Sequence, residues 1–388
     1  MSGIVIIGAN EYQNKLILKA ESLGYTTHVF AWEHGAVGKK NASFFYPISV
    51  MEKEAILEEC LRIKPEGVCS VASDLCNITA GYLTEKLGLC GNTPEAVKRS
   101  TNKALMRAAF AKAGIPSPCS TKVKASDSEA EIIGRISQMQ YPLIIKPTDR
   151  SGSRGVRKVE RIEDVIPAVQ AAISAGFENA AMIEEYVEGA EYSVEYISWR
   201  GRHKFMALTE KFTTGAPSFI ETGHLQPAAV SSGMLYKVKT LTEKALDSLG
   251  IEYGASHSEL KISNEGDIKF IEIGSRMGGD CIGSDLTALS TGDDYLGMVI
   301  DTAVGREPHF NVSASGCPCG IRFILSRDDV DRMKKIPRDH IVETFFNEDF
   351  DGNVSDSSSR GGYFIVKGDT APEVKKYLYG GMIKSKQW

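Results

Sequence analysis

The first seventy residues alternate short apolar runs with stretches that have the periodicity of a helix. The runs and helical stretches follow one another at residues 4–7, 11–23, 27–30, 51–63 and 68–71. Strands that alternate with helices in this way pair in parallel, because each helix carries the chain back across the sheet. We therefore expect an α/β domain. A dehydrogenase that binds NAD is disfavoured, because Gly8 is followed by Ala-Asn-Glu-Tyr-Gln and the Gly-x-Gly-x-x-Gly fingerprint is missing.

More than one domain is expected, because 388 residues exceed the length over which a single hydrophobic core keeps growing. A helix that begins at Lys103 ends at Gly114, and the prolines after it mark a new start. After Pro308 the pattern changes to strands joined by a polar loop. We expect units at residues 1–100, at 101–308 with a small α+β lid at about 115–190, and at 309–388.

The charge and hydropathy of the sequence argue against nucleic acid and membrane as partners. The formal net charge is −5 and basic residues form no block, so a nucleic-acid partner is not expected. The N-terminal apolar run is too short to cross a bilayer and lacks the basic start of a signal peptide. We therefore expect a cytoplasmic protein without membrane contact. The eight cysteines are scattered, and Cys317 and Cys319 have no further ligands nearby in the sequence, so reduced structural thiols are expected.

A predicted hairpin places two glutamates opposite each other. The turn Asn264-Glu-Gly-Asp267 joins two strand-like segments. If Asn264 pairs with Asp267, counting back along both strands pairs Glu259 with Glu272. Directly opposed side chains have Cβ atoms roughly 5 Å apart on one face.

Two carboxylates at this separation repel unless a cation lies between them. A hard dication that bridges carboxylate and phosphate oxygens fits Mg²⁺. The same register places Leu260 opposite Ile271 on the buried face. An exposed acidic face without metal is the alternative, and a bulge or a three-residue loop would change the register.

Two further segments have the composition of a nucleotide site. A strand that ends in Lys146 leads into a loop containing Ser151, Gly152, Ser153 and Gly155, whose backbone N–H groups can surround a phosphate. An ordinary turn is an equally good interpretation of this loop. The stretch from Glu184 to Glu191 turns at Gly189, and it offers backbone groups to adenine and a carboxylate to ribose. Taken alone, a solvated acidic turn explains this stretch better.

Three more side chains are candidates for chemistry. Arg276 follows the hairpin and can clamp a phosphoryl group or a substrate carboxylate, or form a salt bridge with Asp280 or Asp285. His224 and His257 are further candidates, although a lone histidine is more often structural.

In this order the motifs resemble those of the ATP-grasp superfamily of carboxylate-amine ligases, over residues 4 to about 385. The resemblance implies the ATP-grasp fold, α/β and α+β, with an N-terminal Rossmann-like preATP-grasp domain, a mobile lid and a C-terminal subdomain. It implies ATP and Mg²⁺, with Mn²⁺ as a substitute. The matched residues and their implied roles are Lys103 and Lys146 at the phosphates, Ser151, Gly152, Ser153 and Gly155 in the phosphate cover, Glu184, Glu185, Tyr186 and Val187 at adenine, Glu191 at ribose, Lys211 at the terminal phosphate, and Glu259 with Glu272 at the metal.

One departure from the family pattern bears on the metal. Many members have Asn two residues after the second metal-binding glutamate, whereas this chain has Gly274, which has no side-chain oxygen. The usual arrangement of two metal ions is therefore in doubt. The run from Ile271 to Asp280, with Gly223-His224, is most similar to the carbamoyl-phosphate-synthetase-like and L-amino acid ligase branch.

The implied activity is a carbon–nitrogen ligase of small molecules. ATP phosphorylates a carboxylate to an acyl phosphate, and an amine then displaces phosphate. Arg276, Lys211 and His224 are the expected catalytic residues, and His224 with Glu221 is expected to line the acceptor pocket. The expected partners are a small carboxylate, such as an amino acid, an amine and a second copy of the chain. The alternatives are a biotin-dependent or purine-pathway carboxylase that acts on bicarbonate, and a non-catalytic ATP-binding protein.

Overall fold

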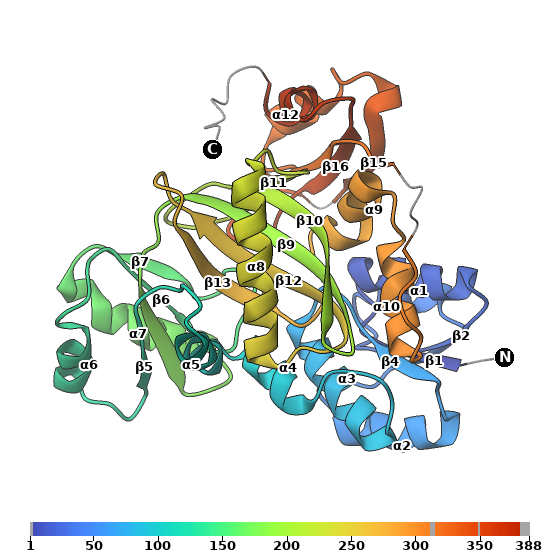
Figure 1. The fold of residues 1–388 in the computed structure, drawn as a ribbon, viewed down its shortest axis with the longest axis horizontal. Coiled ribbons are helices and arrows are strands. Elements are labelled where there is room, and N and C mark those ends of the chain that lie inside the picture. The colour runs from blue at the N-terminus through green and yellow to red at the C-terminus, as the bar shows by residue number, and fades with distance from the viewer. Residues whose placement is uncertain (1–2, 311–314, 348–349, 381–388) are drawn as a thin grey trace.

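A computed structural model describes residues 3–310, 315–347 and 350–380 of the chain. The described residues form three sheets. The N-terminal sheet and the lid sheet lie on opposite sides of a large central sheet, as Figure 1 shows in blue and green. The predicted ATP-grasp architecture, with a parallel N-terminal sheet followed by antiparallel sheets, is confirmed.

The N-terminal sheet is parallel, with the strand order β3-β2-β1-β4. Its elements are β1 (Gly3–Ile7), α1 (Glu11–Ser22), β2 (Thr26–Phe30), η1 (Val37–Asn41), β3 (Phe44–Tyr46), α2 (Lys53–Ile63), β4 (Gly67–Cys69) and α3 (Asp74–Leu87). The edge strand β3 was missed in the sequence because it has three residues and no alternation. The loop after β4 contacts the central domain, where Ala72 N donates to Met277 O at 3.2 Å.

The lid is an antiparallel sheet in the order β5-β8-β6-β7, covered by two helices. Two helices, α4 (Pro94–Thr101) and α5 (Lys103–Ala113), lead into it. Its elements are β5 (Ser120–Lys124), α6 (Glu129–Ile136), β6 (Leu143–Pro147), β7 (Arg157–Val159), η2 (Ile162–Asp164), α7 (Val165–Ala175) and β8 (Ala180–Glu185). The lid has its own apolar core between this sheet and α6 and α7, which allows it to behave as one unit.

The central sheet has eight strands in the order β13-β12-β9-β10-β11-β14-β16-β15. They are β9 (Ala190–Trp199), β10 (Arg202–Thr213), β11 (Glu221–Gln226), β12 (Gly254–Ile262), β13 (Ile268–Gly274), β14 (Cys319–Phe323), β15 (Ile341–Phe346) and β16 (Gly362–Lys367). The helices are α8 (Ser232–Leu249), η3 (Ile282–Leu286), α9 (Thr287–Thr291), α10 (Tyr295–Ala303), α11 (Arg327–Met333), η4 (Arg338–His340) and α12 (Ala371–Tyr379). The C-terminal strands thus continue the sheet that holds the glutamate hairpin.

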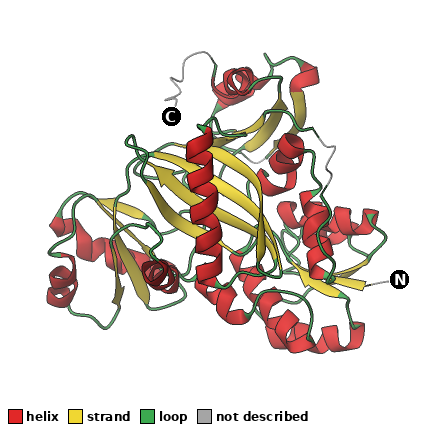
Figure 2. Ribbon diagram, viewed as in Figure 1, coloured by secondary structure: helices red, strands yellow, loops and turns green. Residues whose placement is uncertain are grey.

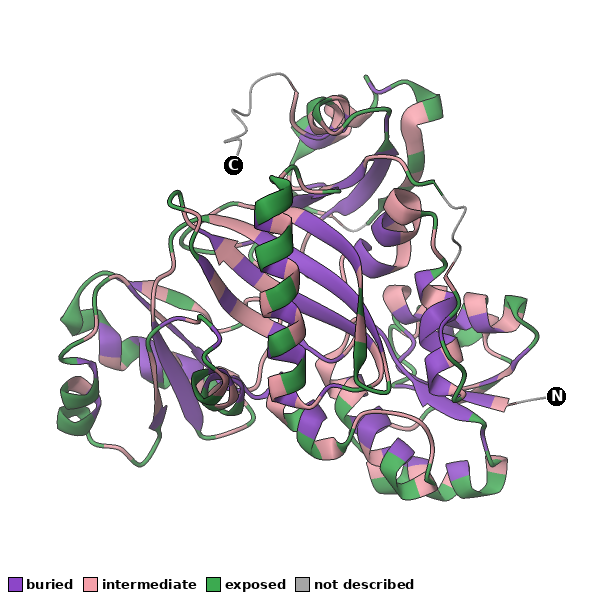
Figure 3. Ribbon diagram, viewed as in Figure 1, coloured by how far each residue is buried: buried purple, intermediate pink, exposed green. Residues whose placement is uncertain are grey.

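Helix α8 lies along one face of this sheet (Figure 2). Its inward side chains are buried in a core with β9, β12 and β13, while its outer side is exposed (Figure 3). The opposite face of the sheet carries the polar side chains described below. Among the described residues, none of the helices has the length and apolar character needed to cross a membrane.

The hairpin turn differs from the predicted one. Ser263 N donates to Asp267 O at 2.9 Å, and Ile262 lies opposite Ile268. The loop therefore has three residues between its closing pair, and the expected pairing of Asn264 with Asp267 is wrong. On its own, this longer loop would shift the register by one residue.

A β-bulge restores the register before the glutamates are reached. Leu260 lies opposite Phe270, and Glu259 lies opposite Glu272, so Ile271 is the extra residue. The expected pairing of Leu260 with Ile271 is wrong, but the predicted pairing of the glutamates is confirmed because the two shifts cancel. The bulge also frees the Ile271 carbonyl, which accepts a hydrogen bond from Nη2 of Arg107 at 2.7 Å.

Candidate active site

A cleft between the lid sheet and the central sheet gathers most of the predicted site residues. All of them line it except Gly155, Lys211 and His224. We call the part of the cleft around Lys103, Lys146, Glu184 and the loop 150–155 the lid end. We call the group of Glu221, His224, Asp280 and Arg360 the far end.

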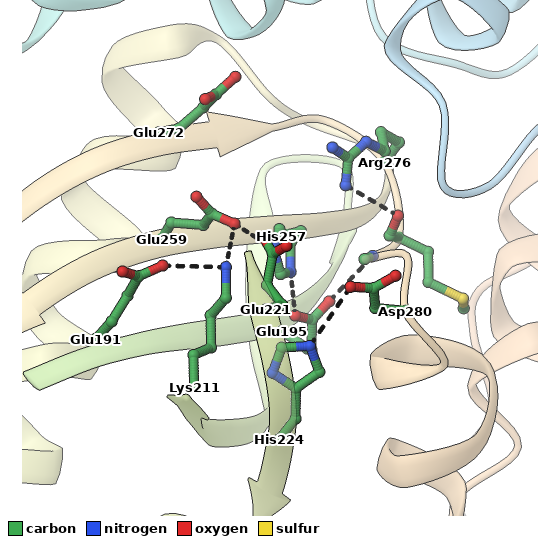
Figure 4. A network of polar contacts seen from close by, with 12 residues as sticks. Glu191, Glu195, Lys211, Glu221, His224, His257, Glu259, Glu272, Arg276 and Asp280 are labelled. Atoms are coloured by element: carbon green, nitrogen blue, oxygen red, sulfur yellow. Dashed lines mark hydrogen bonds and ion pairs between the residues drawn. The ribbon is translucent and has the colours of Figure 1, made fainter. Parts of the chain in front are cut away.

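The two opposed glutamates each face a lysine. Oε1 of Glu272 accepts from Nζ of Lys103 at 2.9 Å, and Oε1 of Glu259 accepts from Nζ of Lys211 at 2.5 Å. Figure 4 shows Glu259 and Glu272 on neighbouring strands and the link from Glu259 to Lys211. The lysines offset the repulsion between the carboxylates, and both carboxylates line the cleft.

Lys211 is buried between two acids on the face of the sheet. Its Nζ lies 3.3 Å from Oε1 of Glu191 and 2.5 Å from Oε1 of Glu259. Burial alone would lower the pKa of Lys211, but these carboxylates raise it well above its usual value. For Glu259, burial would raise the pKa, whereas Lys211 and His257 lower it well below its usual value. The pair is therefore fully charged at neutral pH.

At the lid end, a buried carboxylate is shared by two cations. Nζ of Lys146 lies 2.7 Å from Oε2 of Glu184, and Nε of Arg107 lies 2.8 Å from its Oε1. Burial would raise the pKa of Glu184, but Arg107 and Lys146 lower it to about 2. The Glu184 carboxylate is therefore fully occupied by Lys146 and Arg107.

Arg107 was missed in the sequence, although its position carries a signal. It lies four residues after Lys103 on α5, and residues at this spacing share one face of a helix. Asn102 accepts from the N–H groups of Ala104 and Leu105 and so fixes the start of this helix.

The segment that joins the lid to β9 places an aromatic ring between two lysines. Nζ of Lys158 and Nζ of Lys261 each lie 4.8 Å from the centre of the Tyr186 ring. Phe219, from the loop between β10 and β11, lies at a ring distance of 6.5 Å. The cleft is lined here by Glu185, Tyr186 and Val187. This joining segment, which we call the hinge, therefore contacts both the lid and the central sheet.

The Gly-rich loop is fastened at both ends. Its Arg150 carbonyl accepts from Nζ of Lys103 at 2.7 Å, and the Arg150 guanidinium lies 4.3 Å from the centre of the Phe177 ring. Gly152 and Ser153 have φ angles of 69° and 56°, a left-handed conformation that glycine adopts without strain. At Gly155 a Cβ atom would lie 2.8 Å from Cβ of Ala175. Gly155 is thus required for packing at the base of the loop.

Arg276 pairs with a residue of the N-terminal domain. Its Nε donates to Oδ1 of Asp74 at 2.8 Å, and its Nη1 donates to the Met277 carbonyl at 3.2 Å. The expected alternatives, salt bridges with Asp280 or Asp285, are wrong. Asp280 and Asp285 pair instead with Arg360 and Lys15.

At the far end, several segments converge on Asp280. Arg360 donates to both of its carboxylate oxygens, at 2.6 and 2.9 Å, and the Tyr12 hydroxyl donates at 3.0 Å. The Arg360 guanidinium lies 3.6 Å from the centre of the Phe323 ring. Burial would raise the pKa of Asp280, but Arg360 keeps it well below its usual value. Neither Tyr12 nor Arg360 follows from any local sequence pattern.

His224 lies beneath this group and is fully buried. Its Nε2 is 3.7 Å from Oδ2 of Asp280, which is beyond hydrogen-bond distance, and within the described parts of the chain neither ring nitrogen has a hydrogen-bond partner. Burial lowers the pKa of His224, so the ring is neutral. Glu221 lines the cleft and contacts Ser357 of the C-terminal loop.

His257 lies between the buried carboxylate of Glu195 and the carboxylate of Glu259, which lines the cleft. Its Nδ1 lies 2.5 Å from Oε1 of Glu195, and its Nε2 lies 3.3 Å from Oε1 of Glu259. The other oxygen of Glu195 accepts from the Gly278 N–H at 3.3 Å. Burial would lower the pKa of His257, but Glu195 and Glu259 raise it to about 9. His257 is therefore a cation that orients Glu259.

The donor set at the hairpin fits one divalent cation bound together with phosphates. Glu259 and Glu272 present carboxylate oxygens on one face of the cleft, and Mg²⁺ is commonly bound by one or two carboxylates with substrate phosphates and water. Among the residues that the structure describes, no cluster of three or more His, Cys, Asp or Glu side chains is arranged to hold a metal ion. The chain alone thus offers an incomplete shell that a nucleotide would complete.

Comparison with known proteins agrees with this geometry. Residues 139–284 match a family described as the ATP-grasp domain. The chain is 27% identical over 217 residues to alanine–anticapsin ligase of Bacillus subtilis, a match that covers 50% of this chain and 45% of that protein. It is 25% identical over 353 residues to carnosine synthase 1 of Mus musculus, which covers 84% of this chain and 42% of that protein. The chain therefore spans less than half the length of these two relatives.

Solved structures confirm the fold over nearly the whole chain. An L-amino acid ligase from Bacillus licheniformis superposes with a TM-score of 0.81 at 18% identity, covering 97% of this chain and 96% of that one. A phosphoribosylglycinamide synthetase from Anaerococcus prevotii has a TM-score of 0.77 at 20% identity, covering 97% and 96%. At these identities the likeness establishes the architecture, and the substrates need separate evidence.

Proposed function

We propose, from the premise that this chain has the ATP-grasp fold and carries an ATP-grasp domain, that it is an ATP-dependent ligase that joins a small carboxylate to an amine. The observation that carries the proposal is a pair of opposed glutamates, each in an ion pair with a lysine. They lie in a cleft whose other wall includes a Gly-rich loop. Such a cleft neutralises phosphate charge and orients a γ-phosphoryl group, which is what phosphoryl transfer requires.

In the first step a carboxylate oxygen of the substrate attacks the γ-phosphorus, and the bond to the β,γ-bridging oxygen breaks to release ADP. Lys103 and Lys146 hold phosphate oxygens from the side of the lid, and Arg276 meets the oxygens of the transferring group. When bound at Glu259 and Glu272, Mg²⁺ supplies charge neutralisation at the phosphates. The product is an acyl phosphate.

In the second step the amine nitrogen attacks the acyl carbon, and the bond to the phosphate oxygen breaks. Phosphate leaves and takes up the proton that the amine loses. The lid, hinged at Tyr186, excludes water that would otherwise hydrolyse the acyl phosphate. Its separate apolar core supports such a movement.

The far end is the proposed acceptor pocket. Glu221 lines the cleft, and its backbone carbonyl accepts from Nη1 of Arg360 at 3.5 Å, so the ion pair of Arg360 with Asp280 lies next to this wall of the cleft. His224 is fully buried and neutral, so it does not touch the substrate. The names of the relatives, alanine–anticapsin ligase, carnosine synthase and L-amino acid ligase, support amino acids as the substrate class.

A screen for ADP release tests this proposal. Pairs of amino acids are offered with Mg·ATP, each amino acid is also offered alone, and bicarbonate is offered in a separate arm. We expect ADP release with one or more amino-acid pairs, or with one amino acid ligated to a second molecule of itself, and a product whose mass is the sum of its two components less one water. ADP release that requires bicarbonate would favour the carboxylase alternative, and nucleotide binding without ADP release in any arm would favour a non-catalytic ATP-binding protein.

A further inference from the structure

The loop between β10 and β11 carries a phenylalanine in an uncommon backbone conformation. Phe219 has a φ angle of 50°, in the left-handed region. Glycine adopts this region without strain, whereas a bulky aromatic residue rarely does. Residues held in such conformations cluster at active sites and ligand sites, where the surrounding structure supports the strain. The backbone alone would favour glycine at position 219, so the ring found there calls for a role of the side chain.

Hydrogen bonds on both sides of Phe219 hold this conformation. Its N–H donates to the Gly215 carbonyl at 2.8 Å, and the N–H of Thr214 donates to the Ile220 carbonyl at 2.9 Å. The Ile220 N–H donates to Oγ1 of Thr214 at 3.1 Å, and the Ile220 side chain is buried. The loop is therefore closed on itself and anchored next to Phe219, which gives the ring a fixed place.

The ring of Phe219 lies on the wall of the cleft, beside the hinge. Phe219 lines the cleft, and the centre of its ring is 6.5 Å from that of Tyr186. A base stacked between two rings needs about 7 Å, twice the contact distance of roughly 3.5 Å. The two rings are therefore neighbours on one aromatic wall and leave no room for a base between them.

The cleft also has apolar walls on its other sides. Ile144 and Val156 line it from the lid, Val187 from the hinge and Ile271 from β13. Apolar walls favour a flat, weakly hydrated group of a ligand, whereas phosphates favour the lysines of the lid end. Of the parts of ATP, the purine is the one that matches such walls.

We propose that Phe219 is a nucleotide-binding residue whose ring, fixed by the left-handed backbone, contacts the purine of ATP from the side of the central sheet. The inference rests on the proposed function, because it presumes that ATP binds in this cleft. An aromatic ring offers a purine both apolar area and favourable stacking. That contact explains why a ring is kept at a position where the backbone favours glycine.

The Phe219→Gly variant separates a role in ligand binding from a role in packing. Glycine relieves the left-handed strain, so the melting temperature is expected to stay within about 2 °C of the wild-type value. The affinity for a non-hydrolysable β,γ-imido analogue of ATP, measured by isothermal titration calorimetry with Mg²⁺, is expected to fall roughly 10- to 100-fold, as for loss of an aromatic ring that contacts a base. Wild-type affinity in the variant would overturn the proposal. A melting temperature lower by more than about 5 °C would also overturn it, because the ring would then serve packing.

Two further variants separate the ring from the backbone. Phe219→Asn tolerates the left-handed region without the freedom of glycine, and it is expected to lose as much affinity as Phe219→Gly. Phe219→Tyr keeps the ring and is expected to bind the analogue like the wild type. Wild-type affinity in Phe219→Asn would assign the loss in Phe219→Gly to loop flexibility and would overturn the proposal.

Arg200→Gly is the matched control for the change of backbone. Arg200 has a φ angle of 51° in the turn before β10, at the other end of that strand, and it is exposed and does not line the cleft. Its replacement by glycine is expected to leave the affinity for the analogue unchanged. An equal loss of affinity in Arg200→Gly would show that relief of strain in the sheet, and not the ring of Phe219, controls binding.

Inorganic tripolyphosphate, which carries the phosphates of ATP without the nucleoside, locates the effect. Used as a competitor of the analogue, it is expected to have the same inhibition constant in the wild type and in Phe219→Gly. Equal weakening of both ligands would place the effect at the phosphates and overturn the proposal, with the ligase function left intact. Failure of the analogue to bind the wild-type chain would overturn the proposed function itself.

Discussion

The lid end of the cleft and the far end, which only Glu221 joins to the cleft, both gather buried charges, but they are assembled differently. At the lid end, Glu184 and Glu272 sit on strands, and each faces a cation carried by α5 or β6. At the far end, Asp280 stands on a loop after β13 and is shared by residues of α1 and of the C-terminal loop. The lid-end charges stand on strands and a helix, whereas Asp280 and Arg360 at the far end stand on loops.

The backbone reflects this difference. Asp280 and Cys281 both have positive φ angles, 52° and 60°, although neither is glycine. Two successive left-handed residues cost free energy and persist only where the surroundings hold them. Connecting loops in general vary more between relatives than paired strands do. We infer that the lid end carries the chemistry that ATP requires, and that the far end carries the choice of substrate.

The largest expected effect comes from the Glu272→Gln variant. The neutral amide is a poor ligand for Mg²⁺ and leaves Lys103 without its carboxylate, so Mg-dependent ADP formation is expected to fall by roughly 1,000-fold or more, by comparison with the loss of a single group that stabilises transition-state charge. Steady-state ADP release measures this, and Glu265→Gln, in the exposed turn of the same hairpin, is the matched control. Near-normal turnover in Glu272→Gln would refute the metal assignment.

The second prediction concerns stability at the lid end. Lys146→Met removes one of two cations from the buried Glu184 carboxylate, and the free energy of unfolding is expected to fall by roughly 3 kcal/mol, because breaking a buried ion pair leaves a charge incompletely paired. Urea unfolding followed by circular dichroism measures this. The double variant Lys146→Met with Glu184→Gln is expected to recover part of the loss. Equal stability of the single variant and the wild type would show that Arg107 alone satisfies Glu184.

The pH dependence of stability should report the same buried carboxylate. The pKa of Glu184 is about 2 in the folded chain and near 4.5 ordinarily, so the folded state gains stability from its ionisation above pH 4.5. This contribution is lost as the pH falls from 4.5 towards 2. By pH 3 the loss amounts to about 2 kcal/mol of unfolding free energy. Urea midpoints between pH 7 and pH 3 measure it. The Glu184→Gln variant should lack this component, and an unchanged acid slope in that variant would assign it to other groups.

The same contrast explains how much of the molecule could be predicted from its sequence. The N-terminal sheet follows from alternating apolar runs, and the lid-end residues follow from motifs that lie on single strands or loops. The opposition of Glu259 and Glu272 was predicted correctly from an incorrect turn, because a longer loop and a bulge at Ile271 shift the register in opposite directions. Turn counting cannot detect two errors that cancel.

The partners that could not be predicted are joined across long stretches of chain. Asp74 meets Arg276 over 202 residues, and Arg360 meets Asp280 over 80 residues. Neither contact has a local signal, because the first depends on how the N-terminal domain packs against the central sheet and the second on how the C-terminal strands extend that sheet. Arg107 is different, since its helical spacing from Lys103 provides a local signal.

The smallest expected effect tests whether the far end selects the substrate. Arg360→Gln keeps a donor near Asp280 but removes the cation, and kcat/KM for the carboxylate and amine substrates is expected to fall roughly 10-fold, which corresponds to about 1.4 kcal/mol. The KM for ATP should not change, because Arg360 lies outside the lid end. Lys375→Gln, which breaks another ion pair of the C-terminal subdomain, with Glu210, is the control. If the KM for ATP rose while kcat/KM for the other substrates stayed unchanged, a far-end residue would be acting on the nucleotide. That result would contradict the assignment of ATP binding to the lid end and of substrate choice to the far end.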